Sequence, residues 1–203
     1  MAKPDELPLI YKTPDSWIET ALSDVLQLLN DHAHLERKAA INALELINRW
    51  PDPSAPSSWI PTMAAVAHDE AEHLQTVVGL MTQRGVRLSK DHKNPYAGDL
   101  RKLVRRGEGN RELLDRLIVS ALIEARSCER FEILGRLCPE ERLAKLYAEL
   151  WESEHTHYRI FLALAKELLP REVDERWQEM LQLESEVLQA QEPGPRMHSH
   201  LSD

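Results

Sequence analysis

The chain has 203 residues, of which 42% are hydrophobic and 29% charged, with only seven glycines, and this composition excludes disordered and fibrous proteins. The net charge of −9 argues against a nucleic-acid partner for the molecule as a whole, although the charge is unevenly spread. No uncharged apolar stretch is as long as a membrane span, and no signal-peptide pattern opens the sequence. One cytoplasmic domain, residues 1–203, with reduced thiols and no membrane contact is therefore expected.

Apolar residues recur with helical spacing in five segments, each bounded by a capping residue, proline or glycine. Thr13 and Pro14 begin the first helix, and Pro51 stops it after Trp50. The other helices are expected at 58–85, at 110–138 with Asn110 as the cap, at 139–169 and at 171–191. The tail, residues 192–203, is expected to be irregular.

The lengths of the loops predict how these helices are connected. The loops between helices one and two and between helices three and four are short, so each pair should form an antiparallel hairpin. The connection between helices two and three is much longer, with a short helix expected at 99–106. This organisation predicts an all-α, ferritin-like four-helix bundle over residues 14–169, with one long crossover and an extra C-terminal helix.

The crossover is strongly basic. From Arg84 to Arg111 the sequence has nine Lys or Arg and three acidic residues, a local charge of +6 that leaves −15 on the rest of the chain. Such a segment can bind phosphates even in an acidic protein, whereas the alternative is a solvated loop with local salt bridges.

Glu-x-x-His occurs twice at the centre of an apolar helical stripe. Glu70 and His73 lie on a stripe that runs from Trp59 to Met81, and Glu154 and His157 lie on one from Leu143 to Leu168. Residues three apart project from the same helical face, so both pairs should point into the core. A third match, Glu152 with His155, shares its face with lysines and an arginine and is expected to be solvated.

The other two helices each supply one inward carboxylate, Glu36 and Glu124. Burying one unpaired carboxylate costs several kcal/mol, so four in one core need compensation. Two divalent cations would balance them, and carboxylates with imidazoles suit iron, or less well manganese. A single inward Glu or His is more often a paired core residue, but the six together favour a two-metal site.

The order of these ligands resembles that of the ferritin-like di-iron carboxylate proteins. The stretches DHAHLERKAA, HDEAEHL, LIEARSCERF and ESEHTHYRIF further resemble the MiaE family of tRNA hydroxylases. The resemblance implies a monooxygenase that uses two iron ions and dioxygen to hydroxylate the isopentenyl side chain of the modified adenosine beside the anticodon. It also implies that Glu70 and Glu154 bridge the metals, with Glu36 and Glu124 terminal.

The resemblance also implies that tRNA is a partner. An external reductase or ferredoxin is expected as the electron donor, because the sequence has no flavin or iron–sulfur motif. The protein is expected to be a monomer or small oligomer. Two other functions stay open: an iron-storage or peroxide-handling protein, and a metal-free interaction module.

Further residues are candidates around the centre. Asp69, Ser153, Cys128 and His32, with Ser127, could orient ligands or line the oxygen pocket, or could simply be exposed or packed. The candidate phosphate contacts are Arg84, Arg87, Lys90, Lys93, Arg101, Lys102, Arg105 and Arg106. Tyr96 is a candidate stacking partner for the adenine. Arg196, His198 and His200 could form a lid, the alternative being a disordered tail.

Overall fold

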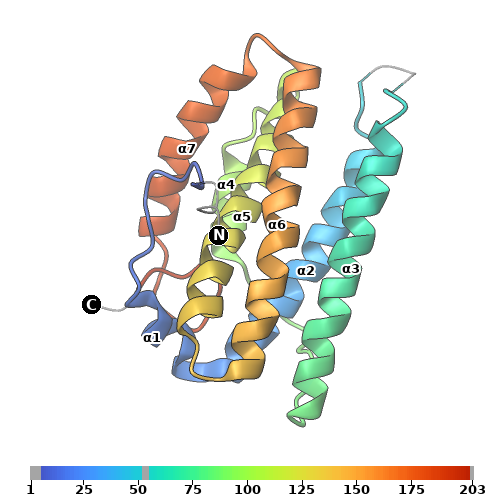
Figure 1. Cartoon of the computed structure of the whole chain (residues 1–203). Helices are drawn as coiled ribbons and strands as arrows, with labels where there is room; N and C mark the ends of the chain where they lie inside the picture. The colour runs from blue at the N-terminus through green and yellow to red at the C-terminus, as the bar shows by residue number, and fades with distance from the viewer. Residues whose placement is uncertain (1–5, 52–54, 202–203) are drawn as a thin grey trace.

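The computed structural model describes residues 6–51 and 55–201, and the regular elements of those residues are helices (Figure 1). They are α1 (Trp17–Ala21), the 3₁₀ helix η1 (Leu22–Asp24), α2 (Val25–Ile47), α3 (Trp59–Gln83), α4 (Pro95–Lys102), α5 (Asn110–Leu137), α6 (Glu141–Leu168) and α7 (Val173–Gln189). The only β interaction among the described residues is an isolated bridge between Pro193 and His200. The predicted all-α class is confirmed.

Two antiparallel hairpins form the bundle. Helix α2 pairs with α3, and α5 pairs with α6, while residues 84–109 cross over between the hairpins and contain α4 (Figure 1). Helix α7 lies along the outer side of α5. This is the crossover arrangement and the extra helix that the loop lengths predict. Within the described residues, no helix combines the length and apolarity needed to cross a bilayer.

The prediction of one continuous helix over 14–50 is wrong, because the helix is interrupted before α2. Asp24 has an extended backbone, with φ −146° and ψ 95°, and its side chain accepts hydrogen bonds from the backbone N–H groups of Leu26 and Gln27. It is therefore the N-cap of α2. Thr13, the expected cap, instead donates through its backbone N–H and its hydroxyl to the carboxylate of Glu129.

Other boundaries move for local reasons. The short crossover helix begins at Pro95 rather than at residue 99, because Asn94 caps it and proline suits the first helical position. Gly109, with a φ of 57°, occupies the N-cap position of α5, so Asn110 is the first helical residue rather than the cap. Glu140 has an extended backbone and precedes α6, which leaves Pro139 just outside the helix.

The apolar core is divided into two halves by a polar layer. One cluster includes Ala43 and Leu46 of α2, Trp59 to Ala67 of α3 and Leu113 to Ala125 of α5. The other includes Leu28 to Ala33 of α2 and Val77 to Met81 of α3. Glu36, on α2, falls between the two clusters, as do the Glu-x-x-His pairs of α3 and α6.

A buried carboxylate anchors the crossover and α7 to α5. Asp115 of α5 has no exposed surface. It accepts hydrogen bonds from the backbone N–H, Nε and Nη2 of Arg105, at 2.8 to 2.9 Å, and from Nε and Nη2 of Arg176, at 2.9 and 3.1 Å. The crossover is thereby fixed to the bundle.

Candidate metal centre

Each of the four bundle helices contributes ligand candidates to the polar layer. Glu36 comes from α2, Glu70 and His73 from α3, Glu124 from α5, and Glu154 and His157 from α6. Five of these six residues are buried, and the side chain of His73 is 13% exposed. The structure therefore brings all six predicted residues into one interior layer.

Four of the six candidates form one compact group. Glu36, Glu70, His73 and Glu154 each offer a ligand atom, and these atoms all lie within 4.8 Å of one another. The Nδ1 atom of His73 lies 3.6 Å from Glu36 Oε2, 3.7 Å from Glu70 Oε2 and 3.3 Å from Glu154 Oε1. One cation could contact an atom from each of these residues.

The remaining two candidates adjoin this group on its α5–α6 side. His157 Nδ1 lies 2.7 Å from Glu70 Oε1 and 3.6 Å from Glu154 Oε2. Burial raises the pKa of Glu124, and Glu124 lies close enough to Glu154 for the charge of Glu154 to raise this pKa further. Glu70 and Glu154 thus lie near both histidines, so the six residues together could hold metal ions.

The pKa values in the layer show how the charges depend on one another. Burial and the charge of Glu154 raise the pKa of Glu70 to about 8. Burial and neighbouring carboxylates raise the pKa of Glu124 well above its usual range. Burial opposes protonation of His73, but the nearby carboxylates of Glu154, Glu36 and Glu70 raise its pKa to about 12. Protons thus balance the carboxylate charge, a role that bound cations can take over.

Unsatisfied buried atoms support metal binding at this layer. Among the described residues, both carboxylate oxygens of Glu70, Oε2 of Glu154, and Nδ1 of His73 and His157 lack a hydrogen-bond partner. Buried polar atoms are normally hydrogen-bonded, so these unpaired oxygen and nitrogen atoms require another partner. Four carboxylates and two imidazoles are the donor set that iron and manganese accept.

Two neighbouring side chains hold ligand candidates in place. The Nε2 atom of His32, one turn before Glu36 on α2, bonds to Glu36 Oε1. The Nε2 atom of His157 bonds to Asp69 Oδ2 at 3.3 Å, so Nδ1 is the atom that faces the carboxylates. A hydrogen bond of this kind fixes the tautomer and orientation of a ligating histidine.

The other predicted neighbours take different positions. Ser153 is half-buried, with no hydrogen bond to a ligand histidine among the described residues. Cys128 is buried, and its thiol lies 3.7 Å from the Trp151 carbonyl oxygen, so it packs in the core. The hydroxyl of Ser127 is 3.2 Å from Nε2 of His198, toward the tail rather than the ligands.

An open pocket leads from the surface to Glu124. It encloses about 740 Å³ of empty space, its mouth included, and lies between α2, α5 and the crossover. Apolar walls come from Leu35, Ala39, Val119 and Ile123. Lys38, Arg101, Arg106 and Arg116 give it four cationic side chains. Lys38 and Arg116 were not predicted from the sequence. Lys38 is two positions from Glu36 and so lies on a different face of α2, whereas Arg116 lies about two turns before Glu124 on α5, which was the available signal.

The predicted phosphate contacts divide into exposed and paired residues. Arg101 and Arg106 are exposed and line the pocket, and Arg87, Lys90 and Lys93 are exposed elsewhere on the crossover. Arg84 pairs with Glu140, and exposed Lys102 pairs with Asp99 at 2.6 Å. The guanidinium of Arg105 holds the buried Asp115, so its role in phosphate binding stays a prediction.

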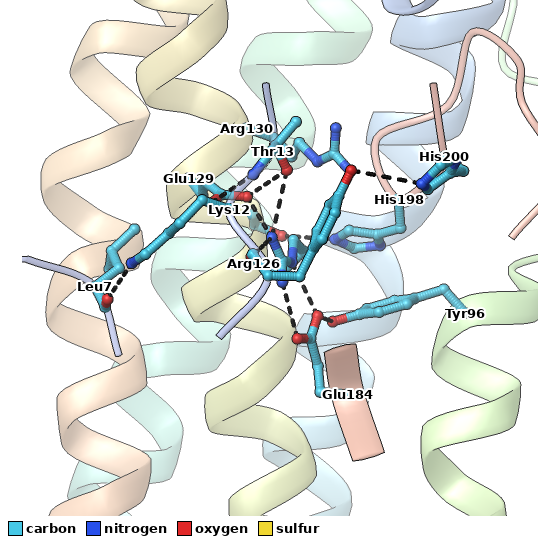
Figure 2. Close-up of polar contacts among 12 residues, drawn as sticks. Leu7, Lys12, Thr13, Tyr96, Arg126, Glu129, Arg130, Glu184, His198 and His200 are labelled. Carbon is cyan, nitrogen blue, oxygen red and sulfur yellow. Dashed lines mark hydrogen bonds and ion pairs between the residues drawn. The ribbon is translucent and has the colours of Figure 1, made fainter. Parts of the chain in front are cut away.

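The predicted stacking role of Tyr96 is wrong. Tyr96 has no exposed surface, and its hydroxyl donates to Glu184 Oε1 at 2.8 Å (Figure 2). The same Glu184 carboxylate accepts from Nε and Nη2 of Arg126, at 2.9 and 2.8 Å, and Arg126 also pairs with Glu129. This network joins α4, α5 and α7, so Tyr96 is a structural residue.

The tail is irregular, as predicted, but it is packed rather than disordered. Met197, His198 and Ser199 are buried. The ring of His198 lies 4.5 Å from that of Tyr96, and the backbone N–H of Met197 donates to Asp31 at 2.8 Å (Figure 2 shows His198 beside the network). His200 lies against Tyr11, and half-buried Arg196 bonds to the carbonyl of Glu192 within the tail.

Comparison with known proteins places this chain in a family. The family model described as tRNA-(MS[2]IO[6]A)-hydroxylase (MiaE) matches residues 2–199. The chain belongs to the MiaE family. A Pseudomonas putida relative, named tRNA 2-(methylsulfanyl)-N(6)-isopentenyladenosine(37) hydroxylase, is 40% identical, with 92% of this chain and 89% of the relative covered. A Salmonella typhimurium protein of the same name is 28% identical, with 92% and 86% covered.

A solved structure agrees with the fold. It is described as Protein 43 with aldehyde deformylating oxygenase activity from Synechococcus, and it superposes with a TM-score of 0.87 at 34% identity. The match covers 96% of this chain and 97% of that one. The ferritin-like bundle predicted from the sequence is therefore confirmed.

Proposed function

We propose that this MiaE-family enzyme is an oxygen-dependent di-iron monooxygenase. Its substrate is the isopentenyl side chain of the modified adenosine next to the anticodon in tRNA. The family match over residues 2–199 carries this proposal, because it spans the whole ligand layer and two relatives in it have this activity as their name.

Six side chains would hold the two iron ions: Glu36, Glu70, His73, Glu124, Glu154 and His157. The bound ions would supply dioxygen activation and the insertion of one oxygen atom into a C–H bond. Hydrogen bonds from His32 to Glu36 and between His157 and Asp69 would keep these ligands oriented. The two apolar halves of the core exclude water above and below the layer.

The pocket that ends at Glu124 suits an apolar group attached to a polyanion. Its apolar walls fit an isopentenyl chain, and Arg101 and Arg106 at its edge fit the tRNA phosphates. The acidic remainder of the chain repels RNA, which favours approach at this face.

Reduction of dioxygen to the alcohol oxygen and one water consumes two electrons and two protons per turnover. The sequence has no flavin or iron–sulfur motif. A separate reductase or ferredoxin is therefore the proposed electron donor.

The test is the nucleoside content of tRNA from a strain in which the gene has been deleted and which makes the isopentenylated precursor. Mass spectrometry should show loss of the hydroxylated nucleoside and accumulation of its precursor. A plasmid copy of the wild-type gene should restore hydroxylation, whereas a Glu70→Ala copy should not. An unchanged level of the hydroxylated nucleoside in the deletion strain would refute the function.

A further inference from the structure

A polar pair interrupts the apolar wall of the pocket. Asn42 of α2 donates through Nδ2 to the hydroxyl of Ser120 on α5 at 2.9 Å, and both residues line the pocket. The Ser120 hydroxyl donates its one proton to the Arg116 carbonyl oxygen at 3.0 Å. Ser120 can therefore only accept from Asn42, which fixes the amide orientation of Asn42.

This orientation leaves two groups of Asn42 available to a ligand. Among the described residues, its Oδ1 atom and its second N–H have no hydrogen-bond partner, and the side chain is half-buried. Asn42 therefore has one acceptor and one donor left for a ligand in the pocket that it lines.

The distance of Asn42 and Ser120 from the ligand layer, measured along the helices, is compatible with the length of the isopentenyl chain. Asn42 is six residues beyond Glu36, and Ser120 is four residues before Glu124, which corresponds to about 9 and 6 Å along the helices. The isopentenyl chain extends four bonds from N6 of the adenine, or about 5 Å at ordinary bond lengths. A chain that reaches the ligand layer therefore leaves its adenine beside Asn42, with the phosphates nearer to Arg101 and Arg106.

The exposed amide groups of Asn42 complement one edge of this adenine. An asparagine side chain can accept from N6–H and donate to N7 of adenine at the same time. Adenine alkylated on N6 keeps one N6–H. When the alkyl group is turned toward N1, this proton lies on the N7 side and both hydrogen bonds are retained. Guanine and the pyrimidines do not present this acceptor and donor in the same order.

We infer that Asn42, oriented by Ser120, recognises the N6–H and N7 edge of the isopentenylated adenine and determines base specificity. This inference rests on the proposed function, because it takes the pocket as the site of the modified nucleotide. Asn42 is a substrate-contacting residue that acts on binding, away from the metal ligands.

The test compares two fluorescent anticodon stem-loop RNAs that differ by one atom. One carries isopentenyladenosine, and the other carries its 7-deaza analogue, in which C–H replaces N7. Dissociation constants are measured by anisotropy with the purified, metal-containing enzyme. Loss of one hydrogen bond should weaken wild-type binding about tenfold for the 7-deaza RNA.

Asn42→Leu, which loses both hydrogen bonds, should bind the two RNAs equally, about ten- to a hundredfold more weakly than the wild type binds the natural one. Asn42→Asp, which keeps the acceptor but loses the donor, should also lose the preference and provides the comparison if the leucine variant does not fold. Gln27→Leu, at an exposed position of α2 outside the pocket, should keep the full preference. Ser120→Ala should reduce it, because Asn42 is then free to rotate.

A tenfold preference that persists in both Asn42 variants, or a wild type that binds the two RNAs equally, would overturn the inference. Failure of the proposed function gives a different result. In that case the wild type would bind the isopentenylated and the unmodified stem-loop alike and would hydroxylate neither.

Discussion

Replacing Asp115 with asparagine should detach the crossover from the bundle. The change keeps the size of the side chain but removes the charge that two guanidinium groups share in a site with no exposed surface. Removing one member of a buried ion pair costs about 3–5 kcal/mol. For a chain of this size, we expect the melting temperature to fall by roughly 6–20 °C.

The measurement is thermal and urea unfolding, followed by circular dichroism. Glu149→Gln is the matched control, because Glu149 pairs with Lys145 on the surface at 3.7 Å and such pairs contribute about 1 kcal/mol or less. Burial favours the neutral form of Asp115, but hydrogen bonds from Arg105 and Arg176 outweigh it and lower the pKa. Because its pKa is lowered, ionised Asp115 stabilises the fold at pH values above the pKa that it has in the unfolded state. This stabilisation is lost in acid, so the difference in stability between wild type and Asp115→Asn should close below about pH 4. A loss below about 1 kcal/mol at pH 7 would refute the anchoring role.

Three further predictions concern the metal centre, the pocket and the cysteines. His157→Ala should lower the iron content measured by plasma mass spectrometry and retain the helical circular dichroism signal; iron at the wild-type level would contradict its role as a ligand. Joint reversal of Arg101 and Arg106 to Glu should weaken stem-loop binding tenfold or more at low salt without changing iron content, and unchanged binding would exclude this face. Iodoacetamide at pH 8 should label half-buried Cys138 before Cys128, where burial raises the thiol pKa further; equal labelling rates on peptide mapping would show that Cys128 is accessible.

The ligand layer could be predicted because periodicity determines which face of a helix is buried. Glu70 and Glu154 interrupt apolar stripes, so an inward direction followed from spacing alone. Glu152 and His155 have the same spacing on a polar face; in the structure Glu152 is exposed, while the ring of His155 stacks on Trp151. The pattern was informative only in its helical context.

The roles of individual charges in the crossover could not be predicted in the same way. Arg105 and Arg106 are adjacent and alike in sequence, yet one binds the buried Asp115 and the other lines the pocket. Which of them turns inward depends on the packing of α7 against α5, a contact between segments about 60 residues apart. The break at Asp24 was missed because the apolar periodicity continues through the cap.

The hydrogen bond between Met197 and Asp31 has a consequence for the order of assembly. Its two partners are separated by 166 positions, and Asp31 adjoins the histidine that contacts Glu36. During synthesis, the ribosome must release residue 197 before this end of the interior can close. A fusion partner attached after residue 201 would follow directly on this contact. The exposed residues Ser57 and Ser58, at the opposite end of the α2–α3 hairpin, offer a more remote position for an inserted label.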